Sequence, residues 1–173
     1  MILIKQAGVY INILNCRLKK YLSEVFRNNG VNLTAEQYLV MDTLWNEGTL
    51  TQQAIAFIIQ KDKNSVTQFI DNLEKKGLVT RLVAKEDRRV NNIVVTPEGM
   101  ALKDSTKQLA IETMNQALEG ISESDVHTFV DVLKKVCSNI SDFGKSSNEL
   151  ELWMDAHVIP TDEGGRESMY GRS

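Results

Sequence analysis

The segment 61–77, KDKNSVTQFIDNLEKKG, carries polar side chains of the types that form hydrogen bonds to nucleic-acid bases. Successive residues of a helix are 100° apart, so the amides of Asn64 and Gln68 share one face. Amide side chains donate and accept at once, and they therefore match the adenine edge in the major groove. An ordinary solvated helix has a similar surface, and this segment taken alone favours that simpler interpretation. The polar face comprises Asn64, Gln68, Asp71 and Lys75, with Thr67 on its flank, and the opposite apolar stripe comprises Val66, Phe69, Ile70 and Leu73.

Residues suited to nucleophilic, acid–base or metal chemistry do not form recognisable sets. Cys16 and Cys137 lie far apart in the sequence and give neither a CxxC pair nor zinc spacing. His127 and His157 are isolated, and neither a glycine-rich phosphate loop nor a Gly-x-Ser-x-Gly motif occurs. The sequence therefore predicts no enzymatic activity, no metal site and no other cofactor.

The net charge of −3 conceals an uneven distribution. Residues 50–96 include eight basic and five acidic side chains, whereas residues 97–144 include four basic and eight acidic ones. The basic surplus therefore surrounds the segment 61–77. A local basic surplus indicates a nucleic-acid partner better than the total charge does.

Two helices are predicted before position 50. The first spans residues 5–28 and ends at an Asn-Asn-Gly run. The second follows Thr34, whose side chain caps the helix and forms a capping box with Gln37. We expect this second helix to end near Asn46.

Two further short helices follow in quick succession. Thr51 caps the first of them, which ends near Gln60. Asp62 caps the next one, and Gly77 stands where a left-handed residue commonly terminates a helix. Two short helices joined by a turn of a few residues are typical of a helix-turn-helix.

A β-hairpin is predicted directly after this pair. Residues 78–83 and 91–96 are rich in apolar and β-branched side chains, and the polar tip AKEDRRV joins them. A helix-turn-helix followed by a hairpin is a winged helix. Arginine on a narrow ribbon suits the minor groove, where negative potential concentrates. The combination favours a DNA-binding surface over a merely solvated turn.

The C-terminal part is predicted to be helical and then irregular. One helix runs over 97–118, with Thr96 as its N-cap and Pro97 in its first turn, and another runs over 123–141. After residue 145 the pattern fades, and we expect a flexible tail. The predicted fold is therefore mainly α, with a small β-hairpin wing.

Targeting signals are not recognisable at the N-terminus. The segment MILIKQAGVYINIL lacks the charged leader, the uninterrupted apolar stretch and the cleavage site of a signal peptide. No apolar run approaches the length of a membrane span. We therefore expect a cytoplasmic protein without a membrane partner.

Several motifs occur in a characteristic order and spacing. They are Leu33-Thr34 with Gln37, LTQQAIA at 50–56, KDKNSVT at 61–67, LEKKGLV at 73–79, Asp87-Arg88-Arg89, and VTPEG at 95–99. Together they resemble the MarR family. The resemblance covers about residues 30–100 by motif and 5–141 by helix order.

The resemblance implies a homodimeric winged helix-turn-helix repressor that binds a palindromic operator on double-stranded DNA. It also implies that the terminal helices of two subunits intertwine, and that a small apolar or phenolic ligand releases the DNA. The corresponding predicted domains are an N-terminal dimerisation helix (1–30), the DNA-binding domain (31–96), C-terminal dimerisation helices (97–144) and the tail (145–173).

The resemblance also assigns candidate DNA contacts. The recognition helix would enter the major groove, the N-terminus at Thr51 would meet phosphate, and Arg88, oriented by Asp87, would reach the minor groove. The family often has arginine where this chain has Gln68, so a charge and a guanine-reading group are missing. The full candidate set is Thr51, Gln52, Lys61, Lys63, Asn64, Ser65, Thr67, Gln68, Lys75, Lys85, Asp87, Arg88 and Arg89.

Two alternative functions stay open at this stage. One is a thiol-based redox sensor of the same fold, in which Cys16 on the first helix reacts and the basic neighbours Arg17, Lys19 and Lys20 favour its thiolate. Cys137 lies in an apolar stripe, where cysteine usually packs as a small hydrophobic residue. The other alternative is a winged-helix protein-interaction module that does not bind DNA.

Overall fold

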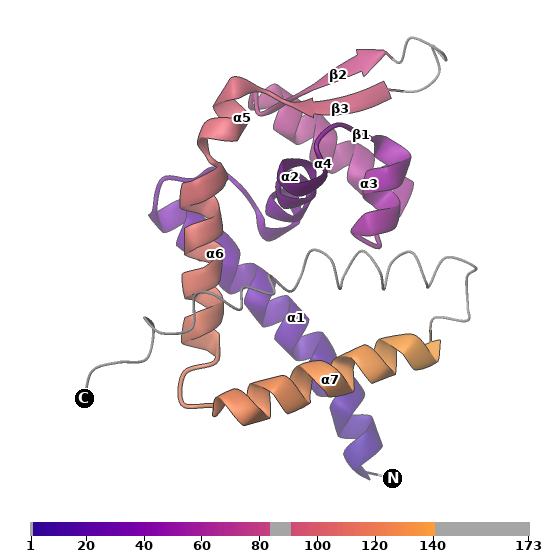
Figure 1. Ribbon diagram of the computed structural model, residues 1–173, viewed down its shortest axis with the longest axis vertical. Helices are drawn as coiled ribbons and strands as arrows, with labels where there is room; N and C mark the ends of the chain where they lie inside the picture. Colours follow the sequence, from indigo (N-terminus) through magenta and orange to yellow (C-terminus); the bar gives the residue numbers. More distant parts are fainter. Residues whose placement is uncertain (1, 84–90, 141–173) are drawn as a thin grey trace, which may run out of the picture. The chain divides into compact units, whose positions relative to one another are not determined.

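The computed structural model describes residues 2–83 and 91–140. The chain divides into two compact units, residues 1–120 and 121–173, which are treated separately below. The first unit contains α1 (Ile2–Asn28), α2 (Ala35–Glu47), β1 (Leu50–Thr51), α3 (Gln52–Ile58), α4 (Lys63–Lys75), β2 (Val79–Val83), β3 (Asn91–Val95), α5 (Pro97–Ala101) and α6 (Lys103–Ala117) (Figure 1). The described part of the second unit is α7 (Glu123–Ile140).

The helices of the first unit begin and end largely where local side-chain chemistry predicts. Thr34 accepts a hydrogen bond from the Gln37 amide (3.2 Å), and the Gln37 side chain accepts from the Thr34 amide (3.2 Å), which completes the capping box. Thr51 and Asp62 cap α3 and α4 as expected. Gly77 has a φ of 72°, so it ends the α4 segment in the left-handed region that glycine adopts without strain.

The wing belongs to a sheet of three strands rather than two. The strand order is β1-β3-β2, and both pairs are antiparallel. Strand β1 was not predicted from the sequence, because a strand of two residues leaves no periodic pattern. Its Thr51 pairs with Asn92 and also caps α3, so one residue joins the sheet to the helix-turn-helix.

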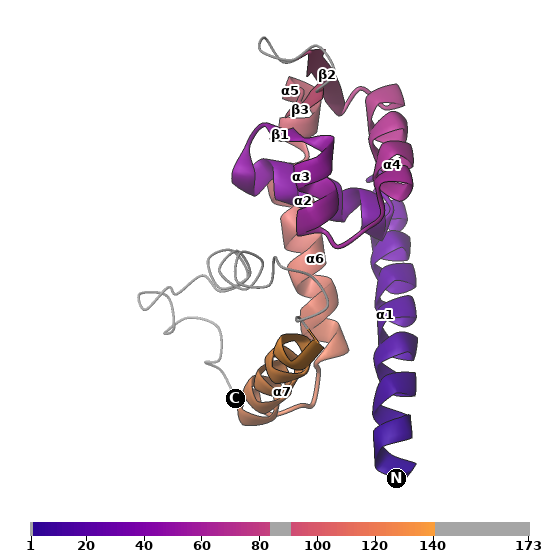
Figure 2. The same ribbon diagram turned by 90° about the vertical axis from the view of Figure 1, so that its right-hand side faces the viewer.

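The hydrophobic core lies among α2, α3, α4 and the sheet. Val66, Ile70 and Leu73 of α4 are fully buried, as are Ile55 of α3 and Ile93 of β3. The C-terminal end of α1 joins this core through its fully buried Phe26. Figure 2 shows α6 beside α1. The observed fold, mainly helical with a small sheet, is a winged helix-turn-helix, which confirms the predicted fold class.

The predicted single helix over 97–118 is wrong at one point. Leu102 separates α5 from α6. Just before this break, the indole Nε1 of Trp45 donates to the carbonyl oxygen of Gly99 at 3.2 Å. A side chain from α2 therefore occupies a carbonyl that an uninterrupted helix would use internally. Sequence periodicity alone does not reveal such a long-range bond.

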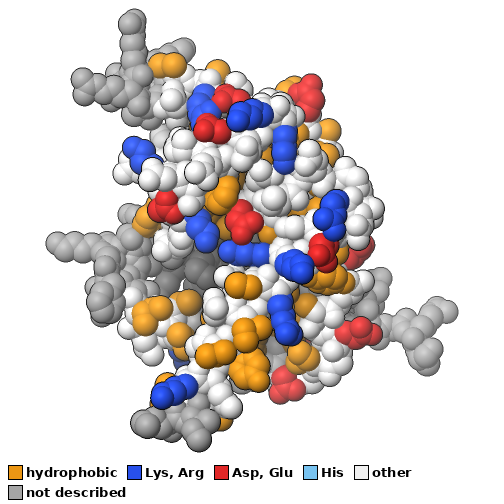
Figure 3. Space-filling model, turned by 180° about the vertical axis from the view of Figure 1, so that it is seen from behind, with side chains coloured by type: hydrophobic (Ala, Val, Ile, Leu, Met, Phe, Trp, Pro, Cys, Tyr) orange, Lys and Arg blue, Asp and Glu red, His pale blue; other side chains and the backbone are white. Residues whose placement is uncertain are grey.

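Apolar side chains are exposed on the N-terminal half of α1. Leu3 is 80% exposed, Val9 57% and Tyr10 66%. Figure 3 shows hydrophobic side chains gathered along this end of the helix. In the second unit, α7 has no buried residue and presents Phe129, Val130, Val132, Val136 and Ile140 to solvent. Among the described helices, none has the length and apolar character needed to cross a membrane.

The start of α5 packs so closely on the sheet that only glycine fits at position 99. A Cβ atom there would lie 2.2 Å from the Leu78 carbonyl oxygen and 2.8 Å from Cγ1 of Val95. Because backbone atoms cannot yield as a flexible side chain does, we expect Gly99→Ala to lower the free energy of unfolding by about 1–3 kcal/mol. Urea denaturation followed by circular dichroism would measure this change.

Gly8 provides the matched control. It lies in α1, and a Cβ there would meet no atom within 4 Å. Alanine favours helix over glycine, so Gly8→Ala should leave stability unchanged or raise it by up to about 1 kcal/mol. Equal effects of the two substitutions would contradict the close approach of α5 to the sheet.

Candidate nucleic-acid interface

Helix α4 is fixed by its N-cap and by its buried apolar stripe. Its N-cap Asp62 accepts hydrogen bonds from the Ser65 amide (2.9 Å) and the Ser65 hydroxyl (2.6 Å). Its apolar stripe packs against α2 and α3, and Phe69 is half-buried beside the three fully buried residues. Burial of this stripe leaves the opposite face of α4 directed to solvent.

Asn64 and Gln68 are exposed on that outer face. Within the part of the chain that the structure describes, neither amide has a hydrogen-bond partner. Lys63 and Lys75 are exposed on the same helix, and Lys61 is half-buried just before it. The outer face thus combines uncommitted amides, which can read base edges, with ammonium groups, which can neutralise phosphate.

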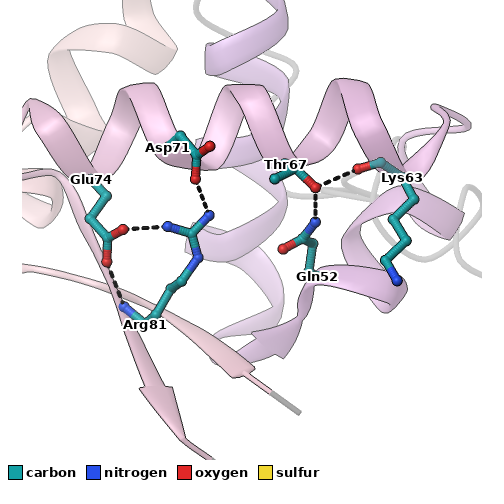
Figure 4. Close-up of polar contacts among 6 residues, drawn as sticks. All are labelled: Gln52, Lys63, Thr67, Asp71, Glu74 and Arg81. Carbon is teal, nitrogen blue, oxygen red and sulfur yellow. Dashed lines mark hydrogen bonds and ion pairs between the residues drawn. The ribbon is translucent and has the colours of Figure 1, made fainter. Parts of the chain in front are cut away.

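The hydroxyl groups in the candidate set already have intramolecular partners. Thr67 Oγ1 donates to the Lys63 carbonyl oxygen (2.8 Å) and accepts from the Gln52 side-chain amide, as Figure 4 shows. Ser65 is occupied at the N-cap of α4, and Thr51 accepts from the Ala54 amide (3.1 Å) at the N-cap of α3. The Gln52–Thr67 bond joins α3 to α4, whereas the Ser65 and Thr51 hydroxyls cap their own helices. Among the described residues, none donates a hydrogen bond to the side-chain carbonyl oxygen of Gln52.

A cluster that the sequence analysis did not identify lies where the wing meets α4. The guanidinium of Arg81, on β2, donates to Asp71 and to Glu74 of α4, and the Arg81 backbone amide donates to Glu74 Oε1 at 3.2 Å (Figure 4). Burial alone would lower the pKa of Arg81, but the hydrogen bonds and negative charges of these two acids raise it. In the sequence, this cluster shows only as an arginine in a predicted strand a few residues after two acids on one helix face. Such a pattern is too common to predict the cluster.

Four predicted contacts lie outside the described residues. Lys85, Asp87, Arg88 and Arg89 belong to the hairpin tip. The strands on either side of them are paired through the register from Val79–Val95 to Val83–Asn91. The two predicted strands of the wing are therefore confirmed, whereas the DNA contacts of residues 85–89 stay a prediction.

The two cysteines are exposed in their respective units. Cys16 lies on α1, and Cys137 lies on α7. The expectation that Cys137 packs as a buried residue is wrong for the single chain, because the apolar stripe of α7 has no covering element within the described part of its unit. Among the described residues, no group of three or more histidine, cysteine or acidic side chains could hold a metal ion.

The helix-turn-helix, the paired wing strands and the polar outer face of α4 define a winged helix-turn-helix protein. Residues 33–90 match the sequence model of the MarR family. Over this segment the chain is similar to the winged-helix regulators of the MarR family.

Known proteins similar to this chain are regulators of transcription. The HTH-type transcriptional regulator MhqR of Bacillus subtilis is 25% identical over 126 residues, which cover 73% of this chain and 86% of that protein. The organic hydroperoxide resistance transcriptional regulator of the same species is 34% identical over 74 residues, which cover 43% and 50%. A cysteine-to-serine mutant of MarR from E. coli, complexed with operator DNA, has a TM-score of 0.71 and 25% identity, covering 77% of this chain and 94% of that one.

The N-cap of α4 makes stability depend on pH. The side-chain and backbone hydrogen bonds from Ser65 lower the pKa of the exposed Asp62 carboxylate. Because the pKa of Asp62 is lower in the folded state than in the unfolded state, its carboxylate stabilises the fold at pH values above the unfolded-state pKa of about 4. This stabilisation is lost as the pH falls below that value and through the folded-state pKa. We expect Asp62→Asn, which keeps an acceptor but cannot ionise, to have a lower melting temperature than the unmodified protein at about pH 6.

Melting temperatures of both proteins between about pH 6 and pH 3 would check this expectation. The difference between them should shrink towards the acidic end, because the Asp62 carboxylate becomes protonated there. A difference that stays constant over this range would contradict a charged cap.

Proposed function

We propose that this protein is a homodimeric transcriptional repressor that binds a palindromic DNA operator and is released by a small ligand. The observation that carries the proposal is the exposed face of α4, where two uncommitted amides lie between lysines on a helix held rigidly by its buried side. The similarity to a MarR structure in complex with operator DNA supports double-stranded DNA as the partner.

In the proposed complex, α4 lies in the major groove. Asn64 and Gln68 contact base edges, while Lys63, Lys75 and Lys61 contact phosphates. The wing tip, with Lys85, Asp87, Arg88 and Arg89, follows the adjacent minor groove. The N-terminus of α3 at Thr51 and Gln52 approaches the backbone.

A second copy of the chain is the proposed partner for the exposed apolar helices. The N-terminal half of α1 and the outward stripe of α7 present more large hydrophobic side chains than an isolated soluble unit ordinarily exposes. A twofold dimer presents two copies of α4 related by symmetry, which accounts for a palindromic operator.

The proposed effector is a small apolar or phenolic molecule that binds between the dimerisation and DNA-binding parts. A thiol switch is the second candidate for release, because Cys16 is exposed on α1. The name of the relative that regulates organic hydroperoxide resistance supports keeping this candidate. Operator affinity measured with the oxidised chain and with a Cys16→Ser variant separates the two routes.

The first test of the function is a selection from random duplex DNA. We expect the unmodified protein to recover a palindromic, A·T-rich motif with adenine opposite Gln68, because glutamine pairs bidentately with adenine. Gln68→Arg should bind all DNA more tightly and shift one symmetric pair of positions towards guanine, by about 1–3 kcal/mol of discrimination.

Two outcomes of the selection would count against the proposal. Failure of the unmodified protein to enrich any sequence would contradict an operator-binding function. Recovery of the same motif by both proteins would mean that Gln68 contacts phosphate and does not read a base.

The oligomeric state is the second test. Sedimentation equilibrium at micromolar concentration should give twice the chain mass of 19.5 kDa. The reason is that a dimer would remove the exposed apolar side chains of α1 and α7 from water, which is favourable. A monomer under these conditions would exclude the symmetric complex.

A further inference from the structure

Two carboxylates lie on the helix that is proposed to enter the major groove. Asp71 and Glu74 belong to α4, and their side chains are 46% and 38% exposed. DNA carries a negative charge at every phosphate, so an uncompensated acid on this helix opposes binding. The helix therefore needs a partner that neutralises these acids without covering its polar face.

Arg81 occupies the position of such a partner. One terminal nitrogen of its guanidinium donates to Asp71 and the other donates to Glu74. Its side chain is only 22% exposed, less than either acid. In Figure 4 the guanidinium lies between the two carboxylates, beneath the same helix that carries Thr67.

The same residue also fixes the root of the wing. Its backbone amide donates to Glu74 Oε1 at 3.2 Å, so Glu74 binds both the main chain and the side chain of Arg81. Arg81 pairs in register with Ile93 of β3, which is fully buried. A displacement of Arg81 would therefore change the path of β2 relative to α4.

We propose that Arg81 is a positioning residue for DNA binding, which acts through Asp71 and Glu74 by neutralising them and by attaching the wing strand β2 to the recognition helix α4. This inference rests on the proposed operator-binding function. Arg81 itself does not contact DNA in this arrangement, because its terminal nitrogens are committed to the two acids.

An exposed ion pair usually contributes little to stability. Arg81 differs because its side chain is mostly buried and engages two acids at once, and because its own backbone amide donates a third hydrogen bond to Glu74. A planar guanidinium can form this fork, whereas a lysine ammonium provides only a point charge.

A double-mutant cycle on DNA affinity tests the proposal. Affinity for the motif recovered by the selection is measured by fluorescence anisotropy for Arg81→Ala, for the pair Asp71→Asn with Glu74→Gln, and for the combination of all three. With the acids present, Arg81→Ala should weaken binding by about tenfold or more. With the acids amidated, the same substitution should change affinity by less than about twofold.

Equal losses in both backgrounds would overturn the proposal, because they would show that Arg81 acts without the two acids. The salt dependence provides a second readout that a merely structural role would not move. In the background where both acids are amidated, the salt slope is compared with and without Arg81→Ala. If Arg81 contacted a phosphate directly, its loss would reduce the magnitude of the slope of log affinity against log salt by about one unit, whereas the proposal predicts no change.

Two further variants control for folding and for charge. Arg81→Lys keeps the charge without the fork, so it should recover part of the affinity lost by Arg81→Ala when the acids are present. Lys107→Ala removes a comparable cation, whose ammonium lies 3.4 Å from Asp42 and whose side chain is 31% exposed, but which lies on α6. The DNA affinity of Lys107→Ala should stay within about twofold of that of the unmodified protein. A loss as large as that of Arg81→Ala would contradict the claim that the effect depends on the position of Arg81 beside α4.

The failure of this inference can be told apart from failure of the proposed function. If the unmodified protein binds no DNA sequence selectively, the function itself is wrong. If it binds selectively and the cycle is additive, only the role of Arg81 is wrong.

Discussion

Burial of one side of α4 is the constraint on which the rest of the structure depends. Val66, Ile70 and Leu73 are fully buried against the neighbouring helices, and each contributes roughly 1.5–3 kcal/mol relative to exposure. Their spacing fixes the rotation of the helix about its axis, so it also decides which side chains remain outside. A one-residue change in this spacing would turn Asn64 and Gln68 away from solvent, because successive residues are 100° apart.

The polar side chains of α4 fall into two groups, hydroxyls that are hydrogen-bonded within the protein and amides that are not bonded to any described residue. The hydroxyls of Ser65 and Thr67 are used to begin the helix and to bind Gln52 of α3. The amides of Asn64 and Gln68 have no such partner among the described residues. A buried or half-buried hydroxyl must be satisfied locally, whereas an exposed amide exchanges water for a ligand at little cost.

Features governed by local chemistry could be predicted from the sequence. The caps Thr34, Thr51 and Asp62 and the left-handed Gly77 were predictable because each acts within a few residues. Features that join distant segments were not predictable: strand β1, which exists through its pairing with β3, the break at Leu102, which coincides with a bond from Trp45, and the cluster around Arg81. The exposed face of α4 followed from periodicity, but the internal commitments of its hydroxyls did not.

The wing and the recognition helix are joined by charge as well as by the chain. Only three residues separate α4 from β2, and the left-handed Gly77 makes so short a turn feasible. A short connection fixes the distance between two elements but leaves their angle free to vary. Bonds from Arg81 to Asp71 and Glu74 lie further from the turn, where they restrict that angle most. In the proposed complex with DNA, these contacts would keep the acids of α4 from opposing a polyanion, and they attach to α4 the strand that precedes residues 84–90.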